Sequence, residues 1–206
     1  MVRLAEGLVT PYHAFAIFSG TAFATALLWP DAAPPALAPL MRGPFLFYTV
    51  AILVGFLGLQ IGEEERGFGV YSPASRFARL ASLVGLGLVL VVPFLLVHRV
   101  ETGLAWPRFG ALVAFTFAWG VFWALVGYGL AAVVHSDGLR FALKYGGLFV
   151  AFLVPLTAGL PVSPFPAVAG LWEGTAVGLW GCVLYGALDL AALGVWTWTS
   201  RRSSIA

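Results

Sequence analysis

The chain contains few charged residues. Only 10% of its 206 residues are Asp, Glu, Lys or Arg, whereas a soluble domain carries about 25%. A single cysteine excludes an intrachain disulfide, so cysteine content does not indicate whether the protein occupies an oxidising or a reducing compartment. The sequence also lacks GxxxxGK[ST], HExxH, CxxC and GxSxG motifs. We therefore expect no enzyme activity, metal site or cofactor in this chain, and a net charge of +2 gives no reason to expect nucleic-acid binding.

Long apolar runs dominate what is present, because 61% of the residues are hydrophobic. A helix needs about 20 apolar residues to cross a membrane, and it satisfies its own backbone polar groups. Runs such as Leu80–Val97 lack the period-two alternation of membrane strands. The sequence predicts an all-α, polytopic integral membrane protein with one domain, 1–206. Its six predicted transmembrane helices are Gly7–Trp29, Pro44–Gly62, Leu80–Val97, Phe109–Val134, Phe141–Leu160 and Thr175–Thr199.

The distribution of basic residues predicts the orientation. With six spans, both termini lie on the same side as the second and fourth loops. Eight of the 11 Lys and Arg residues fall on that side and three on the other. Because cytoplasmic loops carry the excess of Lys and Arg, both termini are expected in the cytoplasm. The expected location is the cell's inner (cytoplasmic) membrane, with the lipid bilayer as a partner.

Proline and glycine patterns predict two further packing features. The loop before the last span is apolar, and three prolines interrupt it, so we expect an outer re-entrant segment, 161–173, packed against protein. Two glycine pairs have the small-xxx-small spacing that lets helix backbones approach closely. These pairs are Gly58 with Gly62, and Gly174 with Gly178.

Asp189 is the one carboxylate deep inside a predicted span. It lies roughly 21 Å along the helix from Thr175, where a charge costs at least about 2.5–3.5 kcal/mol. Two interpretations remain open. Asp189 is either a proton or substrate site, or a packing residue hydrogen-bonded to Gln60 or Tyr128.

Histidines suggest a different function. Among His13, His98 and His135, only His13 and His135 fall near the same membrane face, so only they could meet across the bundle. Imidazole is an axial ligand of haem iron. The alternative function is therefore a membrane anchor subunit of an electron-transfer complex that binds haem or quinone. A structural membrane protein without a transport path is a third possibility.

The stretch that follows the second span is the most specific part of the sequence. It begins with Glu63, Glu64, Glu65, Arg66 and Gly67, and Pro73-Ala74-Ser75-Arg76 then leads through Arg79 into the third span. This order resembles the permease subunits of ABC-2 type transporters. In those subunits a Glu-x-Gly element ends the second span, and a short cytoplasmic helix and a Pro-x-Ser-Arg element follow. The proline-rich segment before the last span is similar to the family's outer segment.

The resemblance implies a permease subunit of an ATP-driven exporter. Such a subunit works as a homodimer or heterodimer with separate ATPase subunits, which bind ATP and Mg²⁺. The coupling loop would be 63–79, and it would transmit movement from the ATPase to the spans. The residues implied in coupling are Glu63, Glu64, Glu65, Arg66, Gly67, Pro73, Ser75, Arg76 and Arg79.

Overall fold

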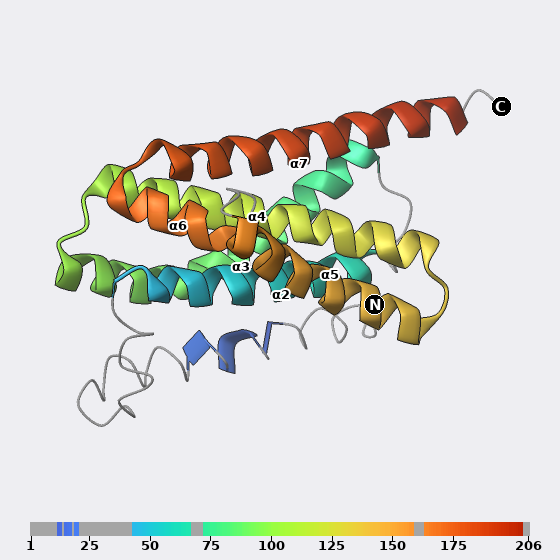
Figure 1. Cartoon of the computed structure of the whole chain (residues 1–206). Coiled ribbons are helices and arrows are strands. Elements are labelled where there is room, and N and C mark those ends of the chain that lie inside the picture. Colours follow the sequence, from blue (N-terminus) through green and yellow to red (C-terminus); the bar gives the residue numbers. More distant parts are fainter. Residues whose placement is uncertain are drawn as a thin grey trace.

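The computed structural model is helical, without strands, in the part of the chain that it describes. That part comprises residues 12–13, 15–17, 19–20, 43–66, 72–158 and 163–203. Most of the first predicted span, Gly7–Trp29, and Gly67 of the predicted coupling loop lie outside it. The helices are α2 (Phe45–Glu65), α3 (Pro73–Thr102), α4 (Trp106–Val133), α5 (Asp137–Ala158), α6 (Pro164–Glu173) and α7 (Ala176–Ser203) (Figure 1). The predicted all-α class is confirmed for these residues.

Among the described residues, four helices are long and apolar enough to cross a membrane. They are α2, α3, α4 and the portion Ala176–Thr197 of α7. The chain is therefore a multi-pass membrane protein with transmembrane helices. Helix α5 occupies the place of the fifth predicted span but is not one of these four candidates.

The helices continue past the apolar windows from which they were predicted. Helix α3 begins at Pro73 rather than Leu80, because the Ser72 side chain accepts a hydrogen bond from the Ser75 amide at 3.2 Å. Proline at the first helical position also favours this start. Helix α2 likewise runs through Glu65. Much of the stretch 63–79, expected as a loop, is therefore helical, because backbone hydrogen bonding does not stop where apolar side chains stop.

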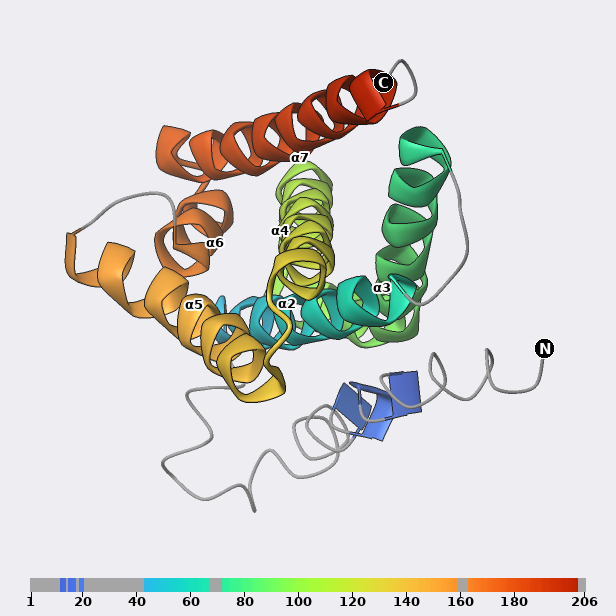
Figure 2. The same ribbon diagram turned by 90° about the vertical axis from the view of Figure 1, so that its right-hand side faces the viewer.

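Helix α4 occupies the middle of the bundle, with α2, α3, α6 and α7 around it (Figure 2). Its contact with α2 is made between backbones. A Cβ atom built on Gly58 would lie 2.3 Å from the Gly120 carbonyl oxygen, and one on Gly62 would lie 1.9 Å from that of Ala124. From the other side, a Cβ on Gly127 would lie 2.3 Å from the Leu59 oxygen. Only glycine fits at these positions, as at other close helix crossings in membranes.

The second glycine pair has a different arrangement from the one expected. Gly174 lies outside α7 and ends α6 in the left-handed region, at φ +78°. Gly178 lies in α7, where a Cβ atom would be 2.2 Å from the Leu171 amide nitrogen. One glycine therefore terminates α6, and the other lets its backbone approach α7. At 10 residues, α6 is about half a span long and lies within the predicted re-entrant segment, 161–173.

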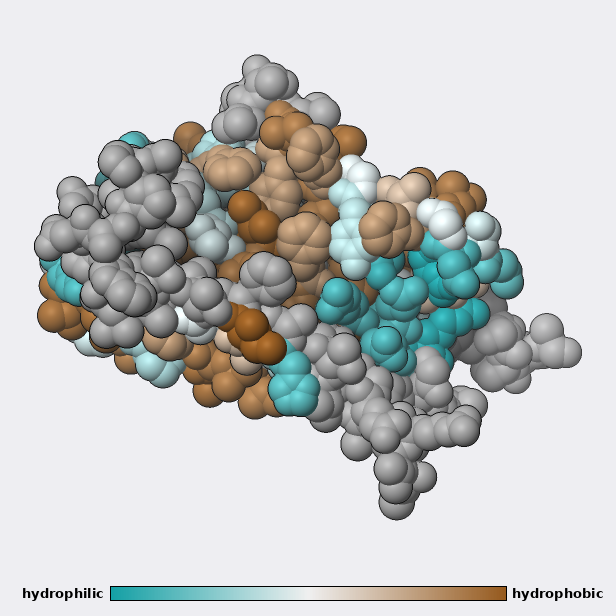
Figure 3. Space-filling view, turned by 90° about the horizontal axis from the view of Figure 1, so that it is seen from below, coloured by the Kyte–Doolittle hydropathy of each residue, from teal (hydrophilic) through white to brown (hydrophobic). Residues whose placement is uncertain are grey.

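The outward faces of α3, α5 and α7 are apolar and exposed. In a membrane these faces contact acyl chains rather than water, which removes the reason to bury them. Figure 3 shows apolar side chains along the body and a hydrophilic patch at one end. The large exposed apolar side chains include Leu86, Val89, Leu90, Phe149, Val150, Leu179, Trp180, Val183 and Leu190.

Candidate functional site: the charged end of the bundle

One end of the bundle collects most of the described charges. Helices α2 and α4 end there, α3 and α5 begin there, and α7 ends on the same side (Figure 1). We call this region the charged end. Its charged residues are Glu63, Glu64, Glu65, Arg66, Arg76, Arg79, Asp137, Arg140 and Lys144.

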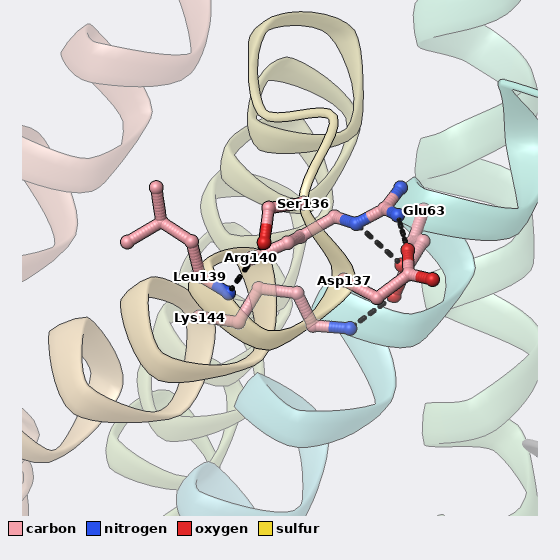
Figure 4. Close-up of polar contacts among 6 residues, drawn as sticks. All are labelled: Glu63, Ser136, Asp137, Leu139, Arg140 and Lys144. Atoms are coloured by element: carbon pink, nitrogen blue, oxygen red, sulfur yellow. Dashed lines mark hydrogen bonds and ion pairs between the residues drawn. The ribbon is translucent and has the colours of Figure 1, made fainter.

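Glu63 links α2 to α5 at the charged end (Figure 4). Its carboxylate forms an ion pair with the Lys144 ammonium and lies 3.3 Å from the Arg140 guanidinium. Arg140 also pairs with Asp137, one turn earlier on α5. The Lys144 side chain is only 6% exposed, so Glu63 compensates a charge that would be costly without a partner. This pair explains how a lysine is accommodated near the start of the fifth predicted span.

Glu65 and Arg79 connect α2 to α3. The Arg79 Nε atom donates to both carboxylate oxygens of Glu65, at 2.8 and 3.0 Å. The Glu65 side chain is completely buried, and a buried carboxylate requires such compensation. Glu65 therefore acts inside the chain and is not accessible to another protein.

Arg76 points toward the other helices of the bundle. Its Nη1 atom donates a hydrogen bond to the Tyr128 hydroxyl of α4. Its guanidinium carbon lies 5.1 Å from the centre of the Tyr128 ring and 5.7 Å from that of Trp196 in α7. The two rings contact each other with centroids 4.8 Å apart. Arg76 thus joins α3 to both α4 and α7 through a hydrogen bond and cation–π contacts.

Several described residues of the stretch 63–79 are exposed at this end without taking part in the ion pairs above. We call Glu64, Arg66, Ser72, Ala74 and Ser75 the exposed rim, since all five lie on the surface of the charged end. Ser72 and Ser75 hydrogen-bond to each other at 2.9 Å. The rim carries one acidic and one basic side chain beside two hydroxyl groups. Another protein can therefore contact these residues without breaking an ion pair of the bundle.

Asp189 lies away from the charged end. It is 7% exposed on α7, and its Oδ1 atom has no hydrogen-bond partner within the described residues. Gln60 is half-buried on α2, and the Tyr128 hydroxyl accepts from Arg76. No hydrogen bond in the described part of the chain joins Asp189 to either of them.

The histidines do not gather in one place. His98 is buried at the opposite end, where its Nε2 atom lies 2.8 Å from the Gly43 carbonyl oxygen and its ring packs on Trp172. His13 and His135 are both exposed. Within the described ranges, no group of three or more His, Cys, Asp and Glu side chains could hold a metal ion.

Sequence reasoning missed Tyr128 and Trp196 as partners of Arg76. An aromatic residue in an apolar helix has no local feature that identifies its partner, so no signal in the sequence could have found them. The Glu63–Lys144 pair was detectable, because an acidic residue ending one span and a basic residue starting another fall on the same predicted side. No protein-family model, curated protein or solved structure matches the chain.

Proposed function

We propose that this chain is the transmembrane permease subunit of an ATP-driven exporter of ABC-2 type. It has six spans with both termini in the cytoplasm and lies in the cytoplasmic membrane. Separate ATPase subunits hold ATP and Mg²⁺ and dock on the exposed rim. The main observation in support is that this rim adjoins Arg76, which contacts two other helices of the bundle.

The charge distribution supports a cytoplasmic charged end. Most Lys and Arg residues of the chain fall on this side in the six-span topology, as expected for cytoplasmic loops. At the other end, Arg99 lies over the Trp106 ring with its guanidinium carbon 3.6 Å from the ring centre. Arg108 donates there to the Trp172 carbonyl oxygen at 3.2 Å. Tryptophan at this level is typical of a membrane–water interface.

In this proposal the predicted coupling residues have two roles. Glu63, Glu65 and Arg79 hold α2, α3 and α5 together through ion pairs. The exposed rim contacts the ATPase. Arg76 lies between these two groups, so a push on the first turn of α3 reaches α4 and α7 through Tyr128 and Trp196. A rigid-body movement of this kind is a common way to transmit a nucleotide-driven change.

A dimer follows from the number of spans. A subunit of six spans, with α4 already in the middle of the bundle, leaves no wide path through itself, whereas two subunits supply about 12 helices around a shared path. The apolar outward faces of α3, α5 and α7 are available for lipid or for the second subunit. The dimer can be formed by two copies or by this chain and a related one.

A pair of charge reversals tests docking on the exposed rim. Glu64→Lys changes the rim, and Glu101→Lys makes the same change in an exposed residue near the opposite end of α3. Both variants are purified from native membranes by a tag on the chain. We expect an ATPase subunit and vanadate-sensitive ATP hydrolysis to copurify with the wild type and with Glu101→Lys, and both to fall several-fold with Glu64→Lys.

Two results would contradict the proposal. Equal recovery of the ATPase with both variants would exclude the rim as the docking site. A chain that copurifies with no ATPase and shows a Soret absorption band would be an anchor subunit of an electron-transfer complex instead.

A further inference from the structure

Asp189 carries a carboxylate in the middle of a membrane helix and forms no ion pair with the described residues. It is 7% exposed, and its Oδ1 atom is buried without a hydrogen-bond partner among the described residues. No ion pair in the described part of the chain includes it. The described Arg and Lys residues that lie in ion pairs have Glu63, Glu65 or Asp137 as their partners. An ionised carboxylate at this depth requires a counter-charge or a donor.

Aromatic rings surround the same stripe of α7. Tyr185, one turn before Asp189, is buried with its ring 4.9 Å from Trp119 and 5.3 Å from Phe122, measured between centroids. Trp123 of α4 is also buried, and its indole N–H has no acceptor within the described residues. Aromatic faces attract cations, most strongly where water is excluded. A buried carboxylate one helical turn from a cluster of aromatic rings is therefore suited to a cation that also carries apolar surface.

Helix α7 is the least buried of the four candidate spans. Its buried positions form one narrow line, Gly178, Gly181, Tyr185 and Asp189, and most of its other apolar side chains face outward. Figure 2 shows α7 along the outside of the bundle, where it meets α4 and α6. Trp196, two turns beyond Asp189 on α7, contacts Arg76. A movement of Arg76 would therefore act on the helix that carries Asp189.

We propose that Asp189 and the aromatic residues of the α4–α7 interface form a binding site for a hydrophobic organic cation. The carboxylate pairs with the positive charge, and the rings of Tyr185 and Phe122 contact the apolar groups. Such a cation dissolves in the bilayer and reaches the site when α7 tilts away from α4. This inference rests on the proposed function for transport, because it names the substrate class of the exporter. The binding step needs no ATPase.

Two ions of the same size and opposite charge test the proposal. Tetraphenylphosphonium and tetraphenylborate binding to the purified full chain in lipid nanodiscs is measured by equilibrium dialysis. We expect saturable binding of the phosphonium and no comparable binding of the borate. Asp189→Asn should weaken phosphonium binding about tenfold or more, which corresponds to about 1.4 kcal/mol, and Asp189→Glu should largely retain it. Asp137→Asn, which changes an exposed carboxylate at the charged end, should bind like the wild type.

Equal affinity of the wild type for the two ions would overturn the site, and so would undiminished phosphonium binding by Asp189→Asn. If Asp189→Asn does not fold, the comparison of the two ions on the wild type still decides. The proposed exporter function is tested independently of this binding site. If the chain prefers the cation but copurifies with no ATPase, the binding site is supported and the exporter function is refuted. If the chain copurifies with an ATPase but shows no preference for the cation, the exporter function is supported and the binding site is refuted.

Discussion

Replacing Gly62 by alanine should separate the two most closely packed helices. The added Cβ atom would lie 1.9 Å from the Ala124 carbonyl oxygen and 2.7 Å from the Tyr128 amide nitrogen. Favourable contacts need about 3.5 Å, so α2 and α4 must move apart by about 1.5 Å at this point. Both obstructing atoms belong to the backbone and cannot rotate away. We expect a loss of about 1–3 kcal/mol of stability, the usual cost of overpacking a close-packed interior.

Gly129→Ala is the matched control for this change. It also lies in a membrane helix, but a Cβ atom at Gly129 meets nothing within 4 Å. Alanine is the better helix former there by roughly 0.5–1 kcal/mol. The two substitutions should therefore shift the thermal unfolding midpoint of the purified protein in opposite directions. If Gly62→Ala is as stable as Gly129→Ala, the backbone contact between α2 and α4 does not exist.

Two further predictions concern the charged end and the topology. Lys144→Met leaves Glu63 with Arg140 alone and should cost about 1–3 kcal/mol, less than the loss of a fully buried pair because Glu63 is partly exposed. Asp137→Asn should change the unfolding midpoint little, because Asp137 is exposed. Equal unfolding midpoints for Lys144→Met and Asp137→Asn would refute a stabilising ion pair between Lys144 and Glu63. A reporter fused after Ala206 should be cytoplasmic, and a thiol-labelling tag in 30–40 should react from outside. External labelling of the C-terminus on intact cells would overturn the orientation.

Hydrophobicity made the membrane spans readable from the sequence. The apolar runs that predict the second, third, fourth and sixth spans coincide with helices long and apolar enough to cross a membrane, because a backbone inside a membrane must satisfy its own polar groups. The fifth predicted span is also helical, as α5, but it is not among these four candidates. The helix ends could not be placed in this way. Pro73 and Ser72 carry a helix-start signal that lies outside the apolar run, so α3 extends well beyond its predicted start. Gly174 follows the last residue of α6 as a terminating glycine, a signal that the sequence offers but that the spacing to Gly178 obscured.

The partners of the polar residues were less accessible to prediction. The acidic cluster suggested a surface for another protein, yet Glu65 is buried against Arg79, Glu63 is half-buried, and only Glu64 of the three acidic residues is exposed. Adjacent residues on a helix point in different directions, because each is rotated by about 100° from the last. Which of them faces the bundle depends on the neighbouring helices, and a single sequence does not give their placement.

The role of Arg76 provides the most direct test of the central claim. ATP hydrolysis by the complex that copurifies with the chain is compared between the wild type, Arg76→Gln and Arg99→Gln. The second variant breaks an arginine–tryptophan contact at the opposite end and controls for general loss of packing. If movement passes from the ATPase through Arg76 to α4 and α7, Arg76→Gln should still recover the ATPase but lose most of its substrate-stimulated hydrolysis, while Arg99→Gln retains it. Normal stimulation in Arg76→Gln, or no ATPase with the wild type, would contradict the account.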